Sequence, residues 1–599
     1  MKTFASKLTS AFLKINITFE KAVMRFISSF ALVHFALLTK LDVDYLSKEA
    51  VIDKNYIIVL LYVITIFMLM NAALVFCKSD IPERIITFLS VTLLFAGAMF
   101  KINNDYVYIF FMILEAVCCY YCFSGLEKDL KIPKILTKTG YILIALVFAG
   151  FLGSLLALRY ITYCAPNYDF GIFAQMFHYM KETGIPYTTC ERDTLLSHFA
   201  VHMSPIYYLI LPFYCIFESP ITINVAQAVI LTIGFIPLYL LCRRKNLSEG
   251  VTLLFALVYA FYPALMGGTF YDIHENVFLV PCVLFLMYFI EADKTVGIFV
   301  MEALTLAIKE DAAVYVIFIA LFMIFAKKMR LKGSIMLVTA GVYFLFIVWW
   351  LNKYGDGAMV TRYENYEING KGLIEVIKDC ITSPIYVFGQ CCDADKLMFA
   401  LKMLVPLGFL PFFCKRNFGN YLLLAPFMII NLMSNYQYQH SIDFQYNFGV
   451  LAIFFYLSIV NIGEFKPDKR KVLAFFCVAA SVCLFFPTIW YRTNYFKMYS
   501  ESHEQYADIQ QALDDELPDD ATIAINTFLL PHVCDHDIVY QLSPTNPNFE
   551  TRVEYLVFDI RFQEFIDQYN SYTESGDYTL YYSDDNIAIL TYDYYDAIG

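Results

Sequence analysis

Ionisable side chains stand at a few points of a sequence that is otherwise strongly apolar. Such groups usually mark function, because charges at membrane depth are costly. The most compact group is Lys309-Glu310-Asp311, which separates two short apolar runs. If these runs form a hairpin that enters from the cytoplasm, the three charges lie at the outer interface, where Lys309 can bind a phosphate and the carboxylates can orient it. An ion-pair cluster that only stabilises a turn is the alternative.

The segment YDIHEN places Asp272, His274 and Glu275 at the outer end of another apolar run. Carboxylates act in acid–base catalysis and bind divalent ions. Together with Asp169, these residues are the candidates for a metal site. The sequence leaves open whether a cation such as Mg²⁺ or Mn²⁺ binds there. A hydrated helix end without chemistry is the alternative.

Asp169, in YDFGIF, is the only carboxylate between Arg159 and Glu182 and is a candidate general base. It also stands at the expected N-cap of an amphipathic helix over residues 169–183, so a capping role alone is the alternative. One face of this helix consists of Phe170, Phe173, Phe177 and Met180.

Two other polar features lie in predicted outer loops. SHFAVH places His198 and His202 at i and i+4, on one face of a helix. This spacing can bind metal, but two histidines alone are a weak signal, and an interfacial polar pair is the alternative. Arg362 is a second cation, beside Lys309, that can stabilise a phosphate.

The composition indicates an integral membrane protein. Of 599 residues, 59% are hydrophobic and 16% are charged, whereas soluble domains carry about 25% charged residues. The net charge of −12 arises largely from extramembrane segments, and no basic block suggests a nucleic-acid partner. Many of the 16 cysteines lie in apolar runs, as small buried hydrophobic side chains do. The N-terminal segment shows no cleavable signal peptide.

Long apolar runs predict a polytopic α-helical membrane protein with about 15 spanning helices. Several runs are shorter than the ~20 residues that a span needs, which is tolerated beside a polar cavity. The runs are 22–39, 55–77, 85–101, 106–124, 139–161, 222–242, 249–268, 276–290, 296–308, 312–326, 333–351, 397–413, 420–434, 447–463 and 472–490.

Clusters of lysine and arginine orient these helices, because such clusters remain in the cytoplasm. Placing Arg243-Arg244-Lys245, Lys327–Lys332 and Lys466–Lys471 inside puts the N-terminus inside and the C-terminus outside. The apolar stretch 203–217 contains two prolines and would break this alternation. It is therefore predicted to lie in the outer interface, within a long first outer loop over 162–221.

The chain divides into three predicted parts. Residues 1–135 form a four-helix membrane extension, residues 136–490 form the transmembrane core, and residues 491–599 form a small α/β domain outside the membrane. In this last part the pattern predicts helices over 501–515 and 561–572, strands over 522–525, 537–542 and 555–560, and a hairpin made of TLYY and IAILTY.

At its polar segments the sequence resembles a bacterial and archaeal membrane family, domain of unknown function 2079. YDFGIFAQ, SHFAVHMSPIYYLILPFY, VAQAV, PLYLL, YDIHEN and LAIKEDAAVY occur in this order, and ATIAINTFLLPHV and VEYLVFDI resemble the outer domain of that family. The resemblance covers roughly residues 140–599. The first four spans have no counterpart in it.

That family in turn is similar to the GT-C glycosyltransferases, such as the protein mannosyltransferases. Those enzymes have an acidic residue in the first long outer loop and a second acidic site in the next outer loop, which Asp169 and Asp272 match. The resemblance implies a GT-C-like core, a sugar donor linked to polyprenyl phosphate, and an extracytoplasmic acceptor that is a cell-envelope glycan, lipid or protein. His274-Glu275 departs from many such enzymes and leaves metal use open.

The resemblance gives the polar residues roles. Asp169 is the predicted base for the acceptor hydroxyl, and Asp272 and Glu275 are the other candidate catalytic carboxylates. The leaving phosphate needs positive charge more than a general acid. The predicted ligands of substrate and lipid phosphate are His198, His202, His274, Lys309, Glu310, Asp311 and Arg362.

The implied location is the cell membrane of a bacterium or archaeon, with the C-terminal domain outside. A transporter or flippase for a lipid-linked or polar substrate is the main alternative, because charges also line substrate paths. It predicts an inverted repeat, which the sequence does not show. A non-catalytic envelope assembly protein is the other alternative. The sequence names neither the sugar nor the acceptor.

Overall fold

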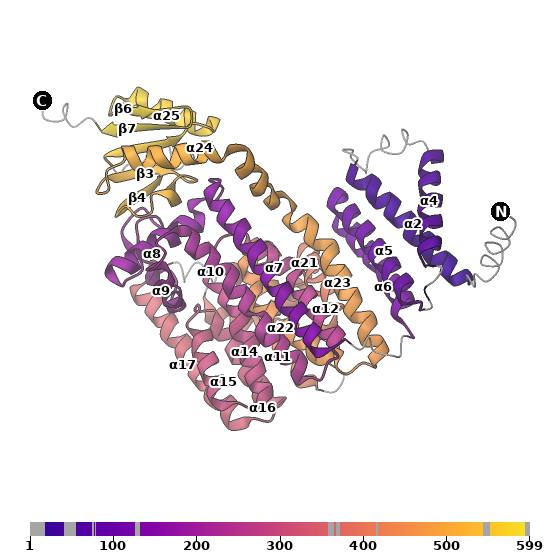
Figure 1. Cartoon of the computed structure of the whole chain (residues 1–599). Helices are drawn as coiled ribbons and strands as arrows, with labels where there is room; N and C mark the ends of the chain where they lie inside the picture. Colours follow the sequence, from indigo (N-terminus) through magenta and orange to yellow (C-terminus); the bar gives the residue numbers. More distant parts are fainter. Residues whose placement is uncertain are drawn as a thin grey trace, which may run out of the picture.

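The structure, a computed structural model, describes residues 18–40, 56–74, 77, 79–125, 132–357, 364–366, 372–414, 417–542 and 552–592. Arg362, one of the predicted phosphate ligands, lies outside these residues. The described chain is mostly helical and ends in a small sheet (Figure 1). Its parts follow the sequence as an N-terminal bundle, a larger helical core and a C-terminal α/β domain.

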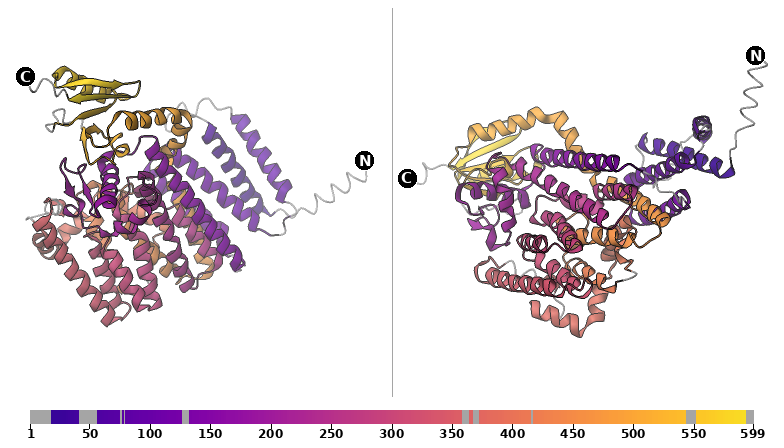
Figure 2. Two further views of the ribbon diagram at one scale, coloured as in Figure 1. Left: turned by 60° about the vertical axis from the view of Figure 1, so that its left-hand side comes forward. Right: turned by 60° about the horizontal axis from the view of Figure 1, so that its bottom comes forward.

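The N-terminal bundle consists of α2 (Phe19–Lys40), α4 (Tyr56–Leu74), α5 (Ile81–Ile102) and α6 (Asp105–Phe123). α4 turns most of its apolar side chains outward, which suits a helix surrounded by lipid. α6 begins after Asn104, whose side chain accepts hydrogen bonds from the amides of Tyr106 and Val107. α5 and α6 pack on α23 (Pro467–Ile489), so the bundle is attached to one flank of the core (Figure 2).

The remaining core helices lie side by side around a buried centre (Figures 1 and 2). They are α7 (Lys134–Ile161), α10 (Pro220–Ile233), α11 (Phe235–Arg244), α12 (Glu249–Ala260), α13 (Pro263–Thr269), α14 (Leu279–Ala292), α15 (Thr295–Leu306), α16 (Ala312–Phe325), α17 (Arg330–Tyr354), α19 (Leu373–Thr382), α20 (Pro384–Gln390), α21 (Ala394–Leu404) and α22 (Phe448–Ile462).

Eleven of the described helical segments are long and apolar enough to cross a membrane. The expectation of about fifteen spans is thus supported only in part. Thr295–Leu306, Ala312–Phe325 and Phe418–Leu432 are shorter apolar helices. The predicted run 397–413 is broken after α21, because Pro406 and Pro411 lack the amide that a continuing helix needs.

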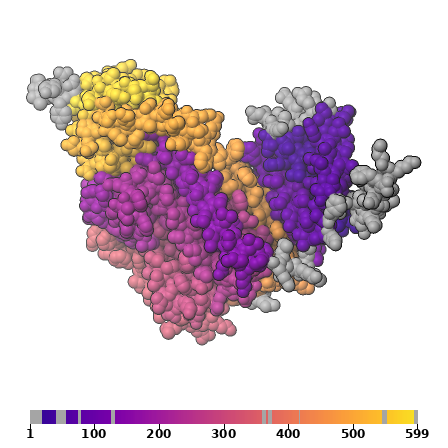
Figure 3. Space-filling model, viewed as in Figure 1, coloured from indigo at the N-terminus to yellow at the C-terminus, as the bar shows by residue number. Residues whose placement is uncertain are grey.

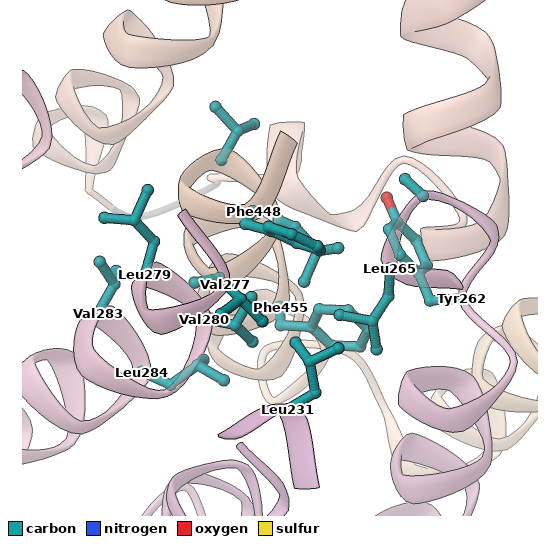
Figure 4. Close-up of a cluster of buried hydrophobic side chains, with 14 of the residues drawn as sticks. Leu231, Tyr262, Leu265, Val277, Leu279, Val280, Val283, Leu284, Phe448 and Phe455 are labelled. Carbon is teal, nitrogen blue, oxygen red and sulfur yellow. The ribbon is translucent and has the colours of Figure 1, made fainter. Parts of the chain in front are cut away.

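The centre of the core is apolar on every side. α14 and α22 are buried around most of their circumference, as expected of helices that are hydrophobic all round. In Figure 4, Val277, in the 3-10 turn before α14, and Val280, in the first turn of α14, lie close to Phe448 and Phe455 of α22. Because Glu275 begins the 3-10 turn that leads into α14, this packing fixes its position.

The predicted outer loop 162–221 contains no spanning helix. It contains α8 (Ile172–Thr183), a two-stranded ribbon of β1 (Tyr187–Thr188) and β2 (Leu196–Ser197), and α9 (Leu211–Tyr214). The stretch 203–217 is short and broken, as its prolines indicated. The apolar face predicted for the helix over 169–183 consists of Phe170, Phe173, Phe177 and Met180. All four side chains are buried in the protein core, so this face does not lie on the membrane.

The C-terminal domain is a five-stranded sheet, with strand order β4-β3-β5-β7-β6, packed against two helices. β3, β4 and β5 are parallel, and β6 and β7 form the predicted hairpin at the other edge. The predicted helices and strands are confirmed within a few residues, except that the first helix begins earlier. The elements are α24 (Asn494–Glu516), β3 (Thr522–Asn526), β4 (Ile538–Leu542), β5 (Tyr555–Asp559), α25 (Gln563–Ser575), β6 (Tyr578–Ser583) and β7 (Ile587–Tyr592).

This domain is bonded to the outer loop that carries Asp169, and Figure 3 shows it seated on that part of the core. The Asn167 amide donates to the Thr527 carbonyl at 3.0 Å, and the Thr189 hydroxyl donates to the Val539 carbonyl at 2.7 Å. His532 stacks on the ring of Tyr163, with centroids 3.8 Å apart. Burial lowers the pKa of His532 to about 3, so this stacked ring is neutral.

Basic side chains from two separate loops meet at the far end of α14. Lys245 and Lys327 bind the Glu291 carboxylate at 2.8 Å and 2.6 Å, respectively. Glu275 and Glu291 lie at opposite ends of one apolar segment, roughly 24 Å apart along a helix. The basic clusters that set the predicted orientation therefore share one end of the core, and the polar residues near Glu275 lie at the other.

The predicted orientation is tested by accessibility to a membrane-impermeant maleimide. Ser571→Cys in α25 is expected to gain labelling over the wild-type chain in intact cells, because the C-terminal domain is predicted to lie outside. Ser334→Cys, at the exposed start of α17 beside Lys332, is expected to gain labelling only after the cells are permeabilised. The reverse pattern would overturn the orientation.

Candidate active site

The centre of the candidate site is a buried ion pair between Glu275 and Lys309. The Lys309 ammonium lies 2.6 Å from Oε1 of Glu275, and both residues are almost completely buried. The other oxygen, Oε2, accepts a hydrogen bond from the Tyr207 hydroxyl at 3.0 Å and lies 3.0 Å from Nδ1 of His274. A buried charge is tolerated only when it is paired in this way.

Lys309 reaches this position because α15 and α16 are too short to span the membrane. The turn between them carries Lys309 and Glu310 into the core, whereas the predicted hairpin would have left the three charges at the outer interface. Glu310 accepts from Nδ1 of His202 at 2.9 Å. Asp311 stands at the N-cap position of α16. The turn thus joins the outer loop to the beginning of α14.

The two histidines of SHFAVH come together without sharing an α-helix. His198 begins a 3-10 turn and His202 follows that turn, so the expectation of one helix face is wrong, although the rings lie 5.7 Å apart. Nδ1 of His198 lies 3.3 Å from the Glu191 carboxylate. Burial alone would lower the pKa of His198, but Glu191 outweighs this effect and raises the pKa.

Asp169 does not cap α8. It lies inside a π-helical turn, Asn167–Gly171, whose N-cap position is taken by Pro166, because the helix begins earlier than its sequence pattern predicted. Burial raises the pKa of the Asp169 carboxyl, while His274 and a hydrogen bond from Tyr271 oppose the shift. Asp169 therefore faces the polar cluster, and the capping alternative for it finds no support in the geometry.

Asp272 is held by a residue that the sequence reasoning did not select. The guanidinium of Arg159, in the last turn of α7, is in direct contact with the Asp272 carboxylate, and both residues are buried. The sequence did contain a signal for Arg159. It is a lone cation at the outer end of a predicted span, whereas cations usually collect at the cytoplasmic ends.

The site contains two neighbouring cavities of about 390 Å³ each. The first contains the lysine turn, with His202, Lys309, Glu310 and Asp311 in its lining. The second contains Asp272 and Arg159. The candidate site residues thus do not all line one cavity: Asp169, His198, His274 and Glu275 line neither of these two.

An aromatic wall separates the two cavities. Tyr436 and Tyr446 line the first, whereas Tyr271 and Phe444 line the second. The Tyr271 and Phe444 rings are 4.8 Å apart, and Phe444 also packs on Tyr438 at 4.3 Å. Asp169 is attached to this wall, because its carboxylate accepts a hydrogen bond from Tyr271.

The four metal candidates do not fit a metal site in this arrangement. No group of three His, Cys, Asp or Glu residues that could hold a metal ion occurs among the described residues. Glu275 is neutralised by Lys309 and Asp272 by Arg159. A divalent cation would have to compete with these two buried pairs for its ligands.

A family model described as predicted membrane protein (DUF2079) matches residues 159–592, which is more than half of the chain. The match begins at Arg159 and includes every candidate site residue, whereas the N-terminal bundle lies outside it. No curated protein and no solved structure matches the chain.

The ion pair at the centre of the site is expected to control stability. Lys309→Met leaves the Glu275 charge buried and unpaired, which costs about 3–5 kcal/mol. The double variant Lys309→Met/Glu275→Gln is expected to recover part of this loss, because no buried charge remains. Chemical unfolding of the purified protein in detergent measures both changes.

Lys332→Met is the matched control, because it breaks an exposed pair with Asp293, which contributes at most about 1 kcal/mol. Equal stability of Lys309→Met and Lys332→Met would contradict the central place given to the buried pair.

Proposed function

The chain belongs to the predicted membrane protein family DUF2079, and from this premise we propose that it is a membrane glycosyltransferase. It moves a sugar from a polyprenyl-phosphate donor to an acceptor outside the membrane. One observation carries this proposal: the buried cation Lys309 is in the lining of a largely apolar cavity, and the Asp169 carboxylate accepts a hydrogen bond from Tyr271, which lines a second cavity.

The first cavity suits the donor because its lining combines two kinds of side chain. Apolar side chains line most of it, and Lys309 is the cation among its polar lining residues. An ammonium has three donors, so Lys309 can hold Glu275 and still donate to a phosphate oxygen. The apolar lining gives room to the first isoprene units: Val314, Phe344, Val376, Ile429, Ile430 and Met433.

The reaction then follows from where the charges lie. The acceptor hydroxyl gives its proton to Asp169 as its oxygen bonds to the anomeric carbon of the sugar. The bond from that carbon to the phosphate oxygen breaks, and polyprenyl phosphate leaves with the bonding electron pair. Lys309 stabilises the negative charge that the phosphate gains. No redox partner is needed for this balance.

The C-terminal domain supports this chemistry by holding the outer loop. The Asn167 side chain, two residues before Asp169, donates to Gln541 of β4 at 2.7 Å. Its backbone amide binds Thr527, as described above. The turn that carries the base is therefore fixed from outside by a folded domain, which favours a constant distance between base and acceptor.

Asp169→Asn is expected to lower transfer by roughly 10²–10⁴-fold, the range for loss of a general base. Transfer from a labelled polyprenyl-phosphate sugar, followed in nanodiscs, measures this loss. Asp193→Asn is the matched control, since it changes an exposed aspartate of the same outer loop.

The pH dependence gives a second readout for Asp169. A base works only when it is deprotonated, so the rate falls as the pH drops through the Asp169 pKa. Burial raises that pKa, which places the fall at higher pH than an exposed aspartate would give. Full activity of a folded Asp169→Asn protein would move the catalytic assignment to another carboxylate.

The donor cavity is tested by filling it. Val314→Phe adds volume to the cavity wall and is expected to raise the donor KM several-fold with a smaller effect on kcat. Val338→Phe on α17 is the control, because this side chain is 63% exposed on the outer surface of the core. If both variants have the same donor KM, the donor does not bind in this cavity.

A further inference from the structure

The second cavity contains a cation that the proposed transfer does not use. Arg492 lies in the 3-10 turn Trp490–Thr493, between α23 and α24, and its side chain reaches the cavity that also contains Arg159 and Asp272. Only 7% of Arg492 is exposed. The cavity therefore has a buried guanidinium in its wall on the side of the C-terminal domain.

Arg492 has fewer partners than a buried guanidinium needs. It has five N–H donors, yet within the described chain its guanidinium makes one long hydrogen bond of 3.3 Å to the Gly267 carbonyl and lies against the rings of Phe270 and Tyr491. Its Nε is buried without a hydrogen-bond partner among the described residues. An unsatisfied buried charge is costly, and a bound anion would satisfy it.

Neither of the two acidic residues that line the cavity supplies the anion for Arg492. The Asp272 carboxylate is held by Arg159, and no ion pair joins Arg492 to Asp443 among the described residues, although both line the cavity. The cavity thus presents a cation and a separate carboxylate that can accept hydrogen bonds from hydroxyl groups.

The aromatic residues at the cavity suit a carbohydrate. Tyr168 and Tyr491 line it and are 66% and 59% exposed, so their rings are free to contact a ligand. A sugar has an apolar C–H face and a rim of hydroxyl groups. The tyrosine rings can contact the face, while the carboxylate and the guanidinium can bind the hydroxyls. A neutral sugar would satisfy the rings and Asp443 but would leave Arg492 unpaired.

We propose that this second cavity is the acceptor site and that its ligand is an anionic carbohydrate, whose phosphate or carboxylate group binds Arg492. The proposal rests on the proposed function, because the base Asp169 is hydrogen-bonded to Tyr271, which lines this cavity. The anion anchors the acceptor at Arg492, and the sugar rings lie on the tyrosines, so that a hydroxyl faces Asp169.

Binding of small sugars to the full-length protein in nanodiscs tests this site without any transfer assay. The probes are glucose 6-phosphate and glucuronate, with glucose and glucosamine for comparison, titrated by saturation-transfer NMR. Both anionic sugars are expected to bind about tenfold or more tightly than glucose, the effect of one charge-assisted hydrogen bond. Equal binding of all four sugars, or preference for glucosamine, would overturn the proposal.

Arg492→Gln is expected to reduce the affinity for the anionic sugars to that for glucose. Arg330→Gln, at the exposed start of α17, is the matched control and should bind like the wild type. Arg492→Lys keeps the charge but loses the forked donors, so an intermediate affinity is expected, and this variant keeps the test open if Arg492→Gln does not fold.

Two outcomes separate this inference from the proposed function. Arginine-dependent binding of anionic sugars by a protein without transfer activity would sustain the site and reject the glycosyltransferase proposal. Transfer activity in a protein that binds anionic and neutral sugars equally would sustain the glycosyltransferase proposal and reject the anionic acceptor site. If Arg492→Gln instead weakens only the binding of polyprenyl phosphate, the cavity holds the donor phosphate and the acceptor assignment is wrong.

Discussion

The pairing of Glu275 with Lys309 is the constraint on which the rest of the site depends. Both charges are buried beside apolar helices, and neither could remain there without the other. The pair joins the beginning of α14 to the turn between α15 and α16, two segments separated by α14, α15 and the loop between them. Tyr207 and His274 complete the shell around Glu275, which brings in the outer loop as well. One ion pair thus gathers three segments at the same end of the core.

This arrangement explains why several apolar runs are shorter than a membrane span. α15 ends and α16 begins at the polar turn that contains Lys309. This turn lies inside the protein, where Lys309 pairs with Glu275. Short helices leave space at the same end, and the two cavities occupy it. The aromatic side chains of Tyr271, Phe444 and Tyr438 pack together beside this space. Apolar walls beside Lys309 and exposed tyrosines beside Arg492 give the two cavities different preferences.

The C-terminal domain contacts the loop of the candidate site, whereas the N-terminal bundle packs on one flank of the core. The domain makes hydrogen bonds to the loop that carries Asp169, and His532 is stacked on Tyr163 at their junction. It therefore acts on the site through the position of that loop. The bundle packs on α23 through α5 and α6, Asp105 of α6 pairs with Lys402 of α21, and the family match does not include the bundle. None of its described side chains lines either cavity.

The sequence by itself determined the features that depend on composition and local pattern. Apolar runs located the eleven candidate spans, prolines kept 203–217 from forming one, and alternating strands located the C-terminal sheet. Costly charges in an apolar chain also marked Glu275, Lys309 and Asp169 before any contact was known. Only the tertiary structure decided which charges meet, because ion pairs such as Arg159 with Asp272 join residues far apart in the chain. It also decided that Asp169 lies inside a π-helical turn and that an aromatic wall separates two cavities, since both result from packing between distant segments and leave no local pattern in the sequence.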